Sequence, residues 1–461
     1  MSIPHSNDRT GARRPERPAG GTGRRVAVVG GGAAGLSAAL RLETLGCDVE
    51  LLEAAGTLGG RFGVDRLGDR PVMTGGKNIG RNYTAFRWLT SELGCDSYES
   101  FGYNASRLKD GEILTLDSQK RGRTLKNIRR MGSSRDFARL AAMAARIKLD
   151  ERNRFLGSRY FSSVSAKHDD APLSAYFGPE MTAMLVRPMV IRNNGAEPDE
   201  VYPGTFGTNV AMLLDHYDQL TGGVRPVLEA FAARVPVRLN TRVEDVEIVD
   251  GAVTGLRVAR DGGPAEAIPY DGVVLATPAY AAAGIVRTAL PGLARRLEDV
   301  RYFPSTVVLV EYDRPMFGAD VRALAMDDGP CSNAGSYGRN DRHIVRYTYS
   351  GRQGRLTDLS EPAIDKLTSE TEEKLRTHLG APPAERVNTL VKHWDAAYSG
   401  YLPHHPAFLA EVRGHVEGVA GLELAGDYIL GVAIEGCARS GRAAAGRLVG
   451  DLSGRPAGAT R

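Results

Sequence analysis

Three glycines and one acid near the start of the chain have the types and spacing of a dinucleotide site. Gly30, Gly32 and Gly35 follow a short apolar strand and open an amphipathic helix. Gly30 permits a tight turn, Gly32 lets a pyrophosphate approach the backbone at the helix start, and Gly35 allows close packing of helix on strand. Glu53 ends a second apolar strand, where its carboxylate can accept hydrogen bonds from both hydroxyls of a ribose. The strand before, the helix after and the acid together favour dinucleotide binding over an ordinary glycine-rich turn.

Two further glycine-rich loops follow soon after this motif. The first contains Gly60 and Arg61, and the second contains Gly75 and Gly76 followed by Lys77. Neither leads from a strand into a helix with a following acid, so neither is a second dinucleotide site. The two loops indicate instead that backbone runs close along a long cofactor.

Another motif, Gly421–Leu448, lies near the end of the chain. An apolar strand ends at Gly426 and Asp427, a turn of small residues follows, and a helix is expected to begin near Ile434. The N–H groups at such a helix start can point at an anion or at the electron-rich edge of a ring.

In combination, these motifs resemble those of the flavoprotein superfamily of protoporphyrinogen oxidases, phytoene desaturases and monoamine oxidases. The resemblance runs in order from Val26 to Leu448, and the run GDYILGVAIEGCARSG is most similar to the protoporphyrinogen-oxidase type. It implies an α/β fold with a discontinuous Rossmann-like FAD-binding domain and an inserted α+β substrate domain. The residues that it assigns to FAD are Gly30, Gly32, Ala33, Ala34, Gly35, Glu53, Gly60, Arg61, Gly76, Val243, Gly426, Asp427, Ala433 and Ile434.

The resemblance also distributes these residues along the cofactor. The first motif would bind the ADP half, with Gly60 and Arg61 on the pyrophosphate and the backbone of Val243 on the adenine. Gly426 and Asp427 would contact the pyrophosphate and the ribityl chain, and the helix start that follows them would face the flavin.

Two departures from the amine-oxidase pattern bear on the reaction. Those relatives usually place a lysine at the start of the strand that here reads TVVLVEYDRP, where this chain has Thr306 or Val307. They also enclose the substrate amine between two aromatic rings. Tyr398 or Tyr401 could supply one ring, but the other position falls at Ala433. Both differences favour desaturation of a C–C or C–N bond over amine oxidation.

The candidate catalytic residues lie in two segments expected to reach the flavin. Lys77 follows the second glycine loop, and an ammonium there could stabilise reduced, anionic flavin. A surface lysine in a loop is the alternative. Tyr398 and His404 could bind substrate or move a proton, with ordinary packing or solvent exposure as the alternative for each.

The positions of these motifs define the expected domains. Residues 24–100, 221–290 and 410–455 would form the FAD-binding domain, and residues 101–220 and 291–409 the substrate domain. Residues 1–23 are rich in Arg, Pro and Gly and predict a disordered tail. Residues 120–159 are strongly basic, with apolar residues at helical spacing. A solvated helix face explains this segment, and an anionic substrate or weak association with an anionic membrane surface are the alternatives.

Composition excludes several other classes of protein. The 461 residues carry a formal net charge of only +4, which does not by itself suggest nucleic-acid binding. The four cysteines form no CxxC pair, which argues against structural zinc and favours a reduced, cytoplasmic protein. No apolar run approaches the ~20 residues that cross a bilayer. Arg13 and Arg14 suggest a twin-arginine export signal, but the apolar stretch after them is the nucleotide-binding strand itself.

We therefore expect an FAD-dependent oxidase or desaturase that removes a hydride and a proton from a small molecule, in a biosynthetic reaction. Three alternatives are left open. The first is a flavin-dependent amine oxidase, the second an FAD-dependent isomerase or mutase without net redox change, and the third a flavin-binding assembly partner. Oligomerisation is left open as well.

Overall fold

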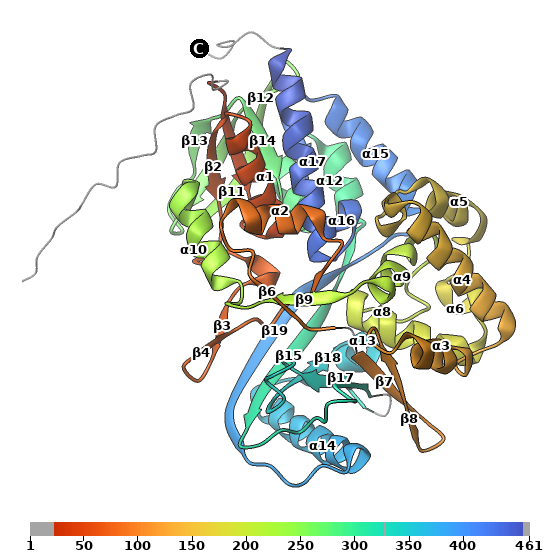
Figure 1. The fold of residues 1–461 in the computed structure, drawn as a ribbon. Helices are drawn as coiled ribbons and strands as arrows, with labels where there is room; N and C mark the ends of the chain where they lie inside the picture. Colours follow the sequence, from red (N-terminus) through yellow and green to blue (C-terminus); the bar gives the residue numbers. More distant parts are fainter. Residues whose placement is uncertain (1–22, 103, 327–328, 455–461) are drawn as a thin grey trace, which may run out of the picture.

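The computed structural model describes residues 23–102, 104–326 and 329–454, and its first sheet unites strands far apart in the sequence (Figure 1). This sheet has the order β10-β2-β1-β14-β20, with all neighbouring strands parallel. The strands are β1 (Arg25–Val29), β2 (Asp48–Leu52), β10 (Val237–Arg238), β14 (Gly272–Leu275) and β20 (Leu422–Leu424). The α/β class is confirmed. The expected tail lies outside the described residues up to residue 22.

Both faces of this sheet are covered, which explains why β1 and β14 are apolar at nearly every position. Successive side chains of a strand point to opposite faces. Accordingly, Val26 and Val28 of β1 belong to one apolar core, and Ala27 and Val29 belong to another.

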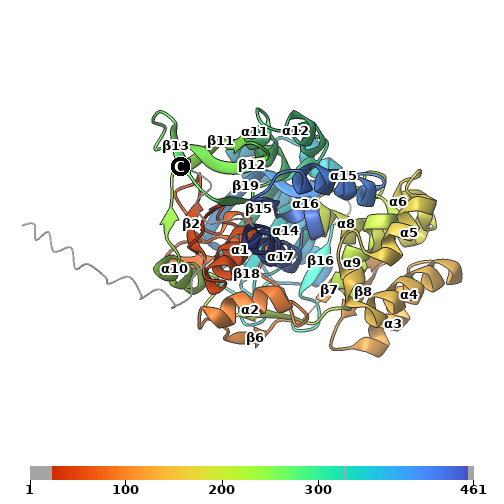
Figure 2. The same cartoon turned by 90° about the horizontal axis from the view of Figure 1, so that it is seen from above.

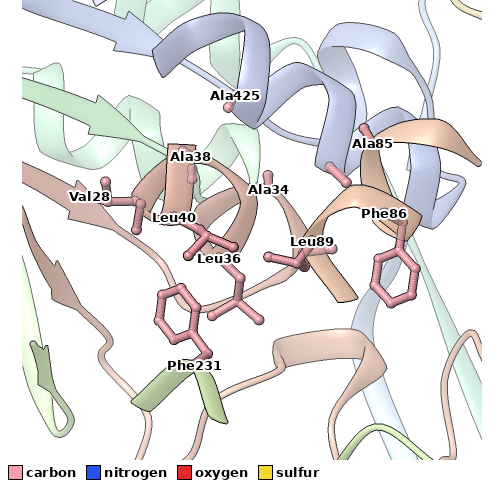
Figure 3. Close-up of a cluster of buried hydrophobic side chains, with 14 of the residues drawn as sticks. Val28, Ala34, Leu36, Ala38, Leu40, Ala85, Phe86, Leu89, Phe231 and Ala425 are labelled. Atoms are coloured by element: carbon pink, nitrogen blue, oxygen red, sulfur yellow. The ribbon is translucent and has the colours of Figure 1, made fainter. Parts of the chain in front are cut away.

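The first core contains Val28, Leu36, Phe86 and Phe231 (Figure 3). The helices around it are α1 (Ala33–Thr44), α2 (Thr84–Glu92), α10 (Arg225–Arg234) and α17 (Ile434–Ser453). α17 begins at Ile434, as the sequence predicts.

The second core lies on the opposite face, as the view from above shows (Figure 2). A meander of three antiparallel strands covers this face together with several helices. These elements are β11 (Thr241–Val249), β12 (Ala252–Arg260), β13 (Glu266–Pro269), α11 (Ala279–Val286), α12 (Pro291–Glu298), α15 (His405–Glu417) and α16 (Asp427–Leu430).

A second, seven-stranded sheet has the order β19-β15-β18-β17-β16-β7-β8. Its strands are β7 (Asn104–Lys109), β8 (Glu112–Asp117), β15 (Arg301–Tyr312), β16 (Ala323–Ala325), β17 (Cys331–Ser336), β18 (Ile344–Tyr349) and β19 (Arg386–Gly400). β15 and β19, the two long strands of this sheet, pair with each other and extend towards the first sheet (Figure 1). Helix α14 (Glu361–Leu379) packs against the seven-stranded sheet. The remaining short elements are α13 (Gly351–Leu356), β3 (Asp65–Leu67), β4 (Arg70–Val72), β5 (Ile79–Gly80), β6 (Tyr98–Ser100) and β9 (Tyr217–Leu220).

A group of helices flanks the second sheet (Figure 1). They are α3 (Arg121–Arg129), α4 (Ser134–Leu149), α5 (Arg159–His168), α6 (Leu173–Tyr176), α7 (Pro179–Met181), α8 (Arg187–Asn194) and α9 (Gly207–Leu214). α4 confirms the helical spacing in the basic segment. It buries Leu140, Met143 and Ile147, and Ser133 and Asp136 form a capping box at its start. Among the described residues, no helix combines the length and the apolar character needed to cross a bilayer.

Helices α1 and α17, which lie far apart in the sequence, pack closely against each other. A Cβ on Gly441 would lie 2.0 Å from the carbonyl oxygen of Ala34, and a Cβ on Gly35 would lie 1.8 Å from that of Gly30. Only hydrogen fits at these two positions, because the obstacles are backbone atoms that cannot move independently.

We expect Gly441→Ala to lower the free energy of unfolding by about 1–3 kcal/mol, because the methyl group forces the two helices apart. Gly446→Ala on the same helix is the control. A Cβ at Gly446 meets nothing within 4 Å, and alanine there favours the helix by up to about 1 kcal/mol. Chemical denaturation measures both, and equal effects of the two substitutions would contradict the close-packing argument.

His405 fixes α15 against α16 and is fully buried. Its Nε2 lies 2.9 Å from the carbonyl oxygen of Tyr428, and its Nδ1 accepts a hydrogen bond from the Leu402 N–H at 3.3 Å. Acceptance at Nδ1 needs the neutral ring, with its proton on Nε2. Burial lowers the pKa of His405 to about 4 from its ordinary value of 6.5, and the hydrogen bond to Tyr428 only partly offsets this effect.

We expect the stability contributed by neutral His405 to be complete above pH 6.5 and lost as the pH falls towards 4. In that window the unfolded chain binds a proton that the folded chain does not. The free energy of unfolding therefore falls by up to about 1.4 kcal/mol for each pH unit. Unfolding free energies from pH 4 to 7 should therefore fall more steeply for the wild type than for His405→Gln. Parallel curves would overturn this assignment.

Candidate active site

A cavity of about 370 Å³ lies between the carboxyl ends of the first sheet's strands and the second sheet. The backbone of Gly32, Ala276 and Gly426 lines one end, directly after β1, β14 and β20. Met184 and Leu185 line the other end. The carboxyl edge of a parallel sheet is the usual place for a ligand in this architecture.

The start of α1 forms the first end of the cavity. Gly30 has φ +104°, and a Cβ there would lie 2.8 Å from the carbonyl oxygen of Ala276, so the turn needs glycine. Gly32 opens onto free space, and Gly60 of the next loop faces it, since a Cβ on Gly60 would lie 3.6 Å from the Gly32 Cα. α1 has neither a side-chain cap nor an acid in its first turn. Its first N–H groups are therefore available to an anion.

Glu53 stands beside this turn, at the end of β2. Its carboxylate accepts hydrogen bonds from the N–H of Gly31 at 2.5 Å and of Ala55 at 2.8 Å. The structure thus brings Glu53 next to the glycine turn, although it does not line the cavity. Val243, in β11, is buried in the second core and does not line the cavity either.

A buried ion pair joins the first of the two glycine-rich loops to the closing motif. Nη1 of Arg61 lies 2.7 Å from Oδ2 of Asp427, whose side chain is only 2% exposed. The hydroxyl of Tyr302, on β15, donates to Oδ1 of Asp427 at 3.0 Å. Burial alone would lower the pKa of Arg61, but the charge and hydrogen bond of Asp427 together with the smaller effect of Tyr302 outweigh burial and raise the pKa. Arg61 therefore stays a cation, and both residues line the cavity.

The start of α17 forms the next part of the wall, through Ala433 and Ile434. Gly76 lies against it, since a Cβ there would be 3.2 Å from Cδ1 of Ile434. The buried carboxylate of Glu435 points elsewhere and accepts from the N–H groups of Ala85 and Phe86, both at 3.0 Å. It thereby caps α2 and ties that helix to α17. Burial raises its pKa, and these hydrogen bonds oppose that rise.

Lys77 lines the cavity on the far side of the glycine loop. Its Nζ lies 3.2 Å from Oε1 of Gln219 and 3.8 Å from the ring centre of Tyr337. Burial, reinforced by the positive charge of Arg346, lowers the pKa of Lys77 to about 7. Both protonation states are therefore accessible near neutral pH.

Of the candidate residues Tyr398, Tyr401 and His404, only Tyr398 lines the cavity. Tyr398 lines the cavity, whereas Tyr401 is buried behind it, where its hydroxyl accepts from the Val432 N–H at 2.8 Å. His404 does not line the cavity. Its Nε2 lies 3.0 Å from Asp170, and its side chain is 43% exposed. The reason is local, because His404 takes a left-handed conformation just before α15.

Thr306 and Val307 are the two residues of β15 that could stand where amine oxidases carry a lysine. Because successive side chains of a strand point to opposite faces, only one of them can face the cavity. Val307 lines the cavity, and Thr306 points away from it to Nδ1 of His393, 2.7 Å distant. An aliphatic side chain therefore occupies the cavity-facing position.

The sequence reasoning missed the arginines of the cavity. Arg107, Arg192, Arg322 and Arg346 all line it, and they come from segments with no glycine motif. Strand pairing brings Arg107, Arg322 and Arg346 together, and α8 adds Arg192, so no local spacing could have revealed them. Among the described residues, no group of three or more His, Cys, Asp or Glu is placed to hold a metal ion.

Comparison with known proteins agrees with this geometry. Residues 33–449 match the family described as flavin containing amine oxidoreductase. The fold is similar to that of a redesigned putrescine oxidase, with a TM-score of 0.70 and 17% identity over 93% of this chain and 99% of the other. A protein from Exiguobacterium sp. 255-15, named as a candidate protoporphyrinogen oxidase, gives a TM-score of 0.67 and 18% identity over 95% and 100%. The CLA-producing fatty acid isomerase from P. acnes gives 0.65 and 15% over 92% and 98%.

The chain belongs to the flavin containing amine oxidoreductases; it is a flavin-dependent oxidoreductase, and its cofactor is FAD. The residues present fit this cofactor. Gly32 leaves open space beside uncapped N–H groups, and the buried hydroxyl of Thr277, which lines the cavity, has no hydrogen-bond partner among the described residues. Gly32, Gly60 and Arg61 would hold the pyrophosphate, Glu53 the ribose, and Ile434 the flavin.

We expect Glu53→Ala to weaken FAD binding about 10- to 100-fold, because two charge-assisted hydrogen bonds to the ribose are lost. Titration of the apoprotein with FAD, followed by fluorescence, measures the affinity. Glu229→Ala, at an exposed surface pair with Arg225, is the control and should bind FAD normally. Unchanged affinity in Glu53→Ala would refute the ribose assignment.

Proposed function

We propose that this flavoenzyme is an oxidase or desaturase that removes a hydride and a proton from a small molecule, in a biosynthetic reaction. One observation carries the proposal. A single cavity joins the expected pyrophosphate site at Gly32 and Arg61 to a chamber that Tyr398 and Met184 line. A substrate held in that chamber can therefore meet the flavin end of an extended FAD.

Three features of the chamber support carbon-centred desaturation over amine oxidation. Val307 occupies the cavity-facing position where the amine oxidases that this chain resembles carry a lysine. Ala433 lines the wall where they carry the second aromatic ring. Besides Arg61, which is paired with Asp427, four arginines line the cavity and would repel a substrate ammonium.

The chain itself supplies a proton acceptor. FAD, when bound, supplies the acceptor for the hydride. Lys77, with a pKa of about 7, is poised to accept the accompanying proton, since a general base works best when its pKa is near the working pH. Gln219 holds its Nζ by a hydrogen bond, and the Tyr337 ring beneath it stabilises the ammonium that forms. Tyr398 supplies a wall against which the substrate can pack.

An anaerobic screen tests the function. The purified holoenzyme is mixed with candidate substrates without oxygen, and bleaching of the flavin absorbance identifies the substrates that reduce it. Bleaching by a compound with a C–C or C–N bond that can be desaturated supports the proposal. Conversion only after dithionite reduction would favour an isomerase or mutase instead.

With such a substrate, we expect kcat/KM to rise as the pH increases through about 7, because Lys77 must lose its proton before it can act as a base. Lys77→Met should lower kcat/KM by about 10²- to 10⁴-fold and remove this limb of the pH profile. Lys120→Met, at an exposed pair with Asp320, is the control. If Lys77→Met keeps the same pH limb, another group is the base.

A further inference from the structure

We propose that the substrate enters as an anion, with its carboxylate bound by arginines of the second sheet and its apolar body in the chamber beyond. The inference rests on the proposed function, because it names the substrate class of that same cavity. It goes beyond the family description, which would suggest an amine.

The arginines come from neighbouring strands of one sheet. Arg107 lies on β7, Arg322 directly precedes β16, and Arg346 lies on β18. These strands follow one another in the order β18-β17-β16-β7. Gly335 of β17 pairs with both Ala323 and Arg346, so Arg346 lies across β17 from Ala323, the residue that follows Arg322 in the chain. All of these residues line the cavity.

The guanidinium groups of Arg322 and Arg346 donate hydrogen bonds to uncharged backbone carbonyl oxygens. Nη1 of Arg322 donates to the carbonyl oxygen of Phe101 at 2.6 Å, and Nη1 of Arg346 donates to that of Gly75 at 2.8 Å. Neither forms an ion pair with a described residue. Burial lowers the pKa of both guanidinium groups, and Asp117 opposes this effect only at Arg322.

Arg322 is buried and Arg346 is half-buried, and cations withdrawn from water are costly unless an anion compensates them. Asp427 is the only acid in the cavity lining that the structure describes, and it is already paired with Arg61. The described lining therefore lacks a counter-charge at the end where the substrate would bind. A carboxylate fits this need, since a guanidinium can hold both of its oxygens.

The rest of the chamber suits an apolar body. Leu116, Met184, Leu185, Met189 and Leu213 line it. Methionine side chains adapt to irregular shapes, so this wall can accept a flexible or ring-shaped hydrocarbon. An ammonium headgroup would instead meet only cations and neutral groups at this end.

Binding to the oxidised holoenzyme tests the proposal without turnover. Calorimetry at pH 8, above the pKa of Lys77, compares a carboxylate, an alcohol and an amine on each of three skeletons: hexyl, 3-phenylpropyl and decyl. We expect the carboxylate of at least one skeleton to bind 10-fold or more tightly than its alcohol, and the amine to bind weakest. If no carboxylate in the three series shows this preference, the proposal fails.

Variants assign the preference to the arginines. Arg346→Gln and Arg322→Gln should each reduce the carboxylate affinity about 10-fold while changing the alcohol affinity less than 3-fold. Arg66→Gln, at an exposed pair with Asp69, should change neither. A merely structural role would weaken both ligands together and would contradict the assignment. The comparison of the three headgroups on the wild-type protein stands even if a variant does not fold.

The outcome is separable from that of the proposed function. If carboxylates bind preferentially but no compound reduces the flavin, the anion site stands and the oxidoreductase proposal fails. If an amine reduces the flavin and carboxylates show no preference, the oxidoreductase proposal stands and the anion site fails.

Discussion

The ion pair between Arg61 and Asp427 is the interaction on which the site depends most. These residues lie 366 positions apart, and the carboxylate is almost completely buried. A buried charge without its partner costs several kcal/mol, so each residue fixes the other. Because Tyr302 also bonds to Asp427, the pair holds the loop that carries Arg61, the start of α16 and strand β15 at one point. Both sheets therefore meet where the cavity begins.

The cavity shows how the same sign of charge can serve two purposes. At one end, backbone N–H groups at the starts of α1 and α17 supply partial positive charge without side chains, which suits phosphates lying close to the backbone. At the other end, guanidinium groups reach in from a sheet. Asp427 is the only acid among the described lining residues, and it is paired with Arg61. Lys77 lies near these cations, and its pKa is lowered first by burial and then by the charge of Arg346.

Much of the first sheet could be predicted from the sequence because its signals are local. The glycines after β1, the acid after β2 and the small residues before α17 each act within a few positions of the chain. The second sheet has weaker signals. Arg322 and Arg346 gain their meaning only from the pairing of β16, β17 and β18, which no spacing along the chain encodes. His404 shows that closeness in sequence to the expected site is not enough. Its left-handed backbone directs its side chain away from the cavity.

The order of strands in the first sheet has a consequence for synthesis of the chain. β1 and β2 are made first, but β14 cannot find its outer neighbour β20 until the ribosome has passed Leu424. α1 can pack against α2 and α10 earlier, but its close contact with α17 forms only after Ile434–Ser453 emerge. Contacts so distant in sequence close slowly. Until these segments emerge, the nascent protein carries an incomplete first sheet with exposed apolar surface, a state that is prone to aggregation.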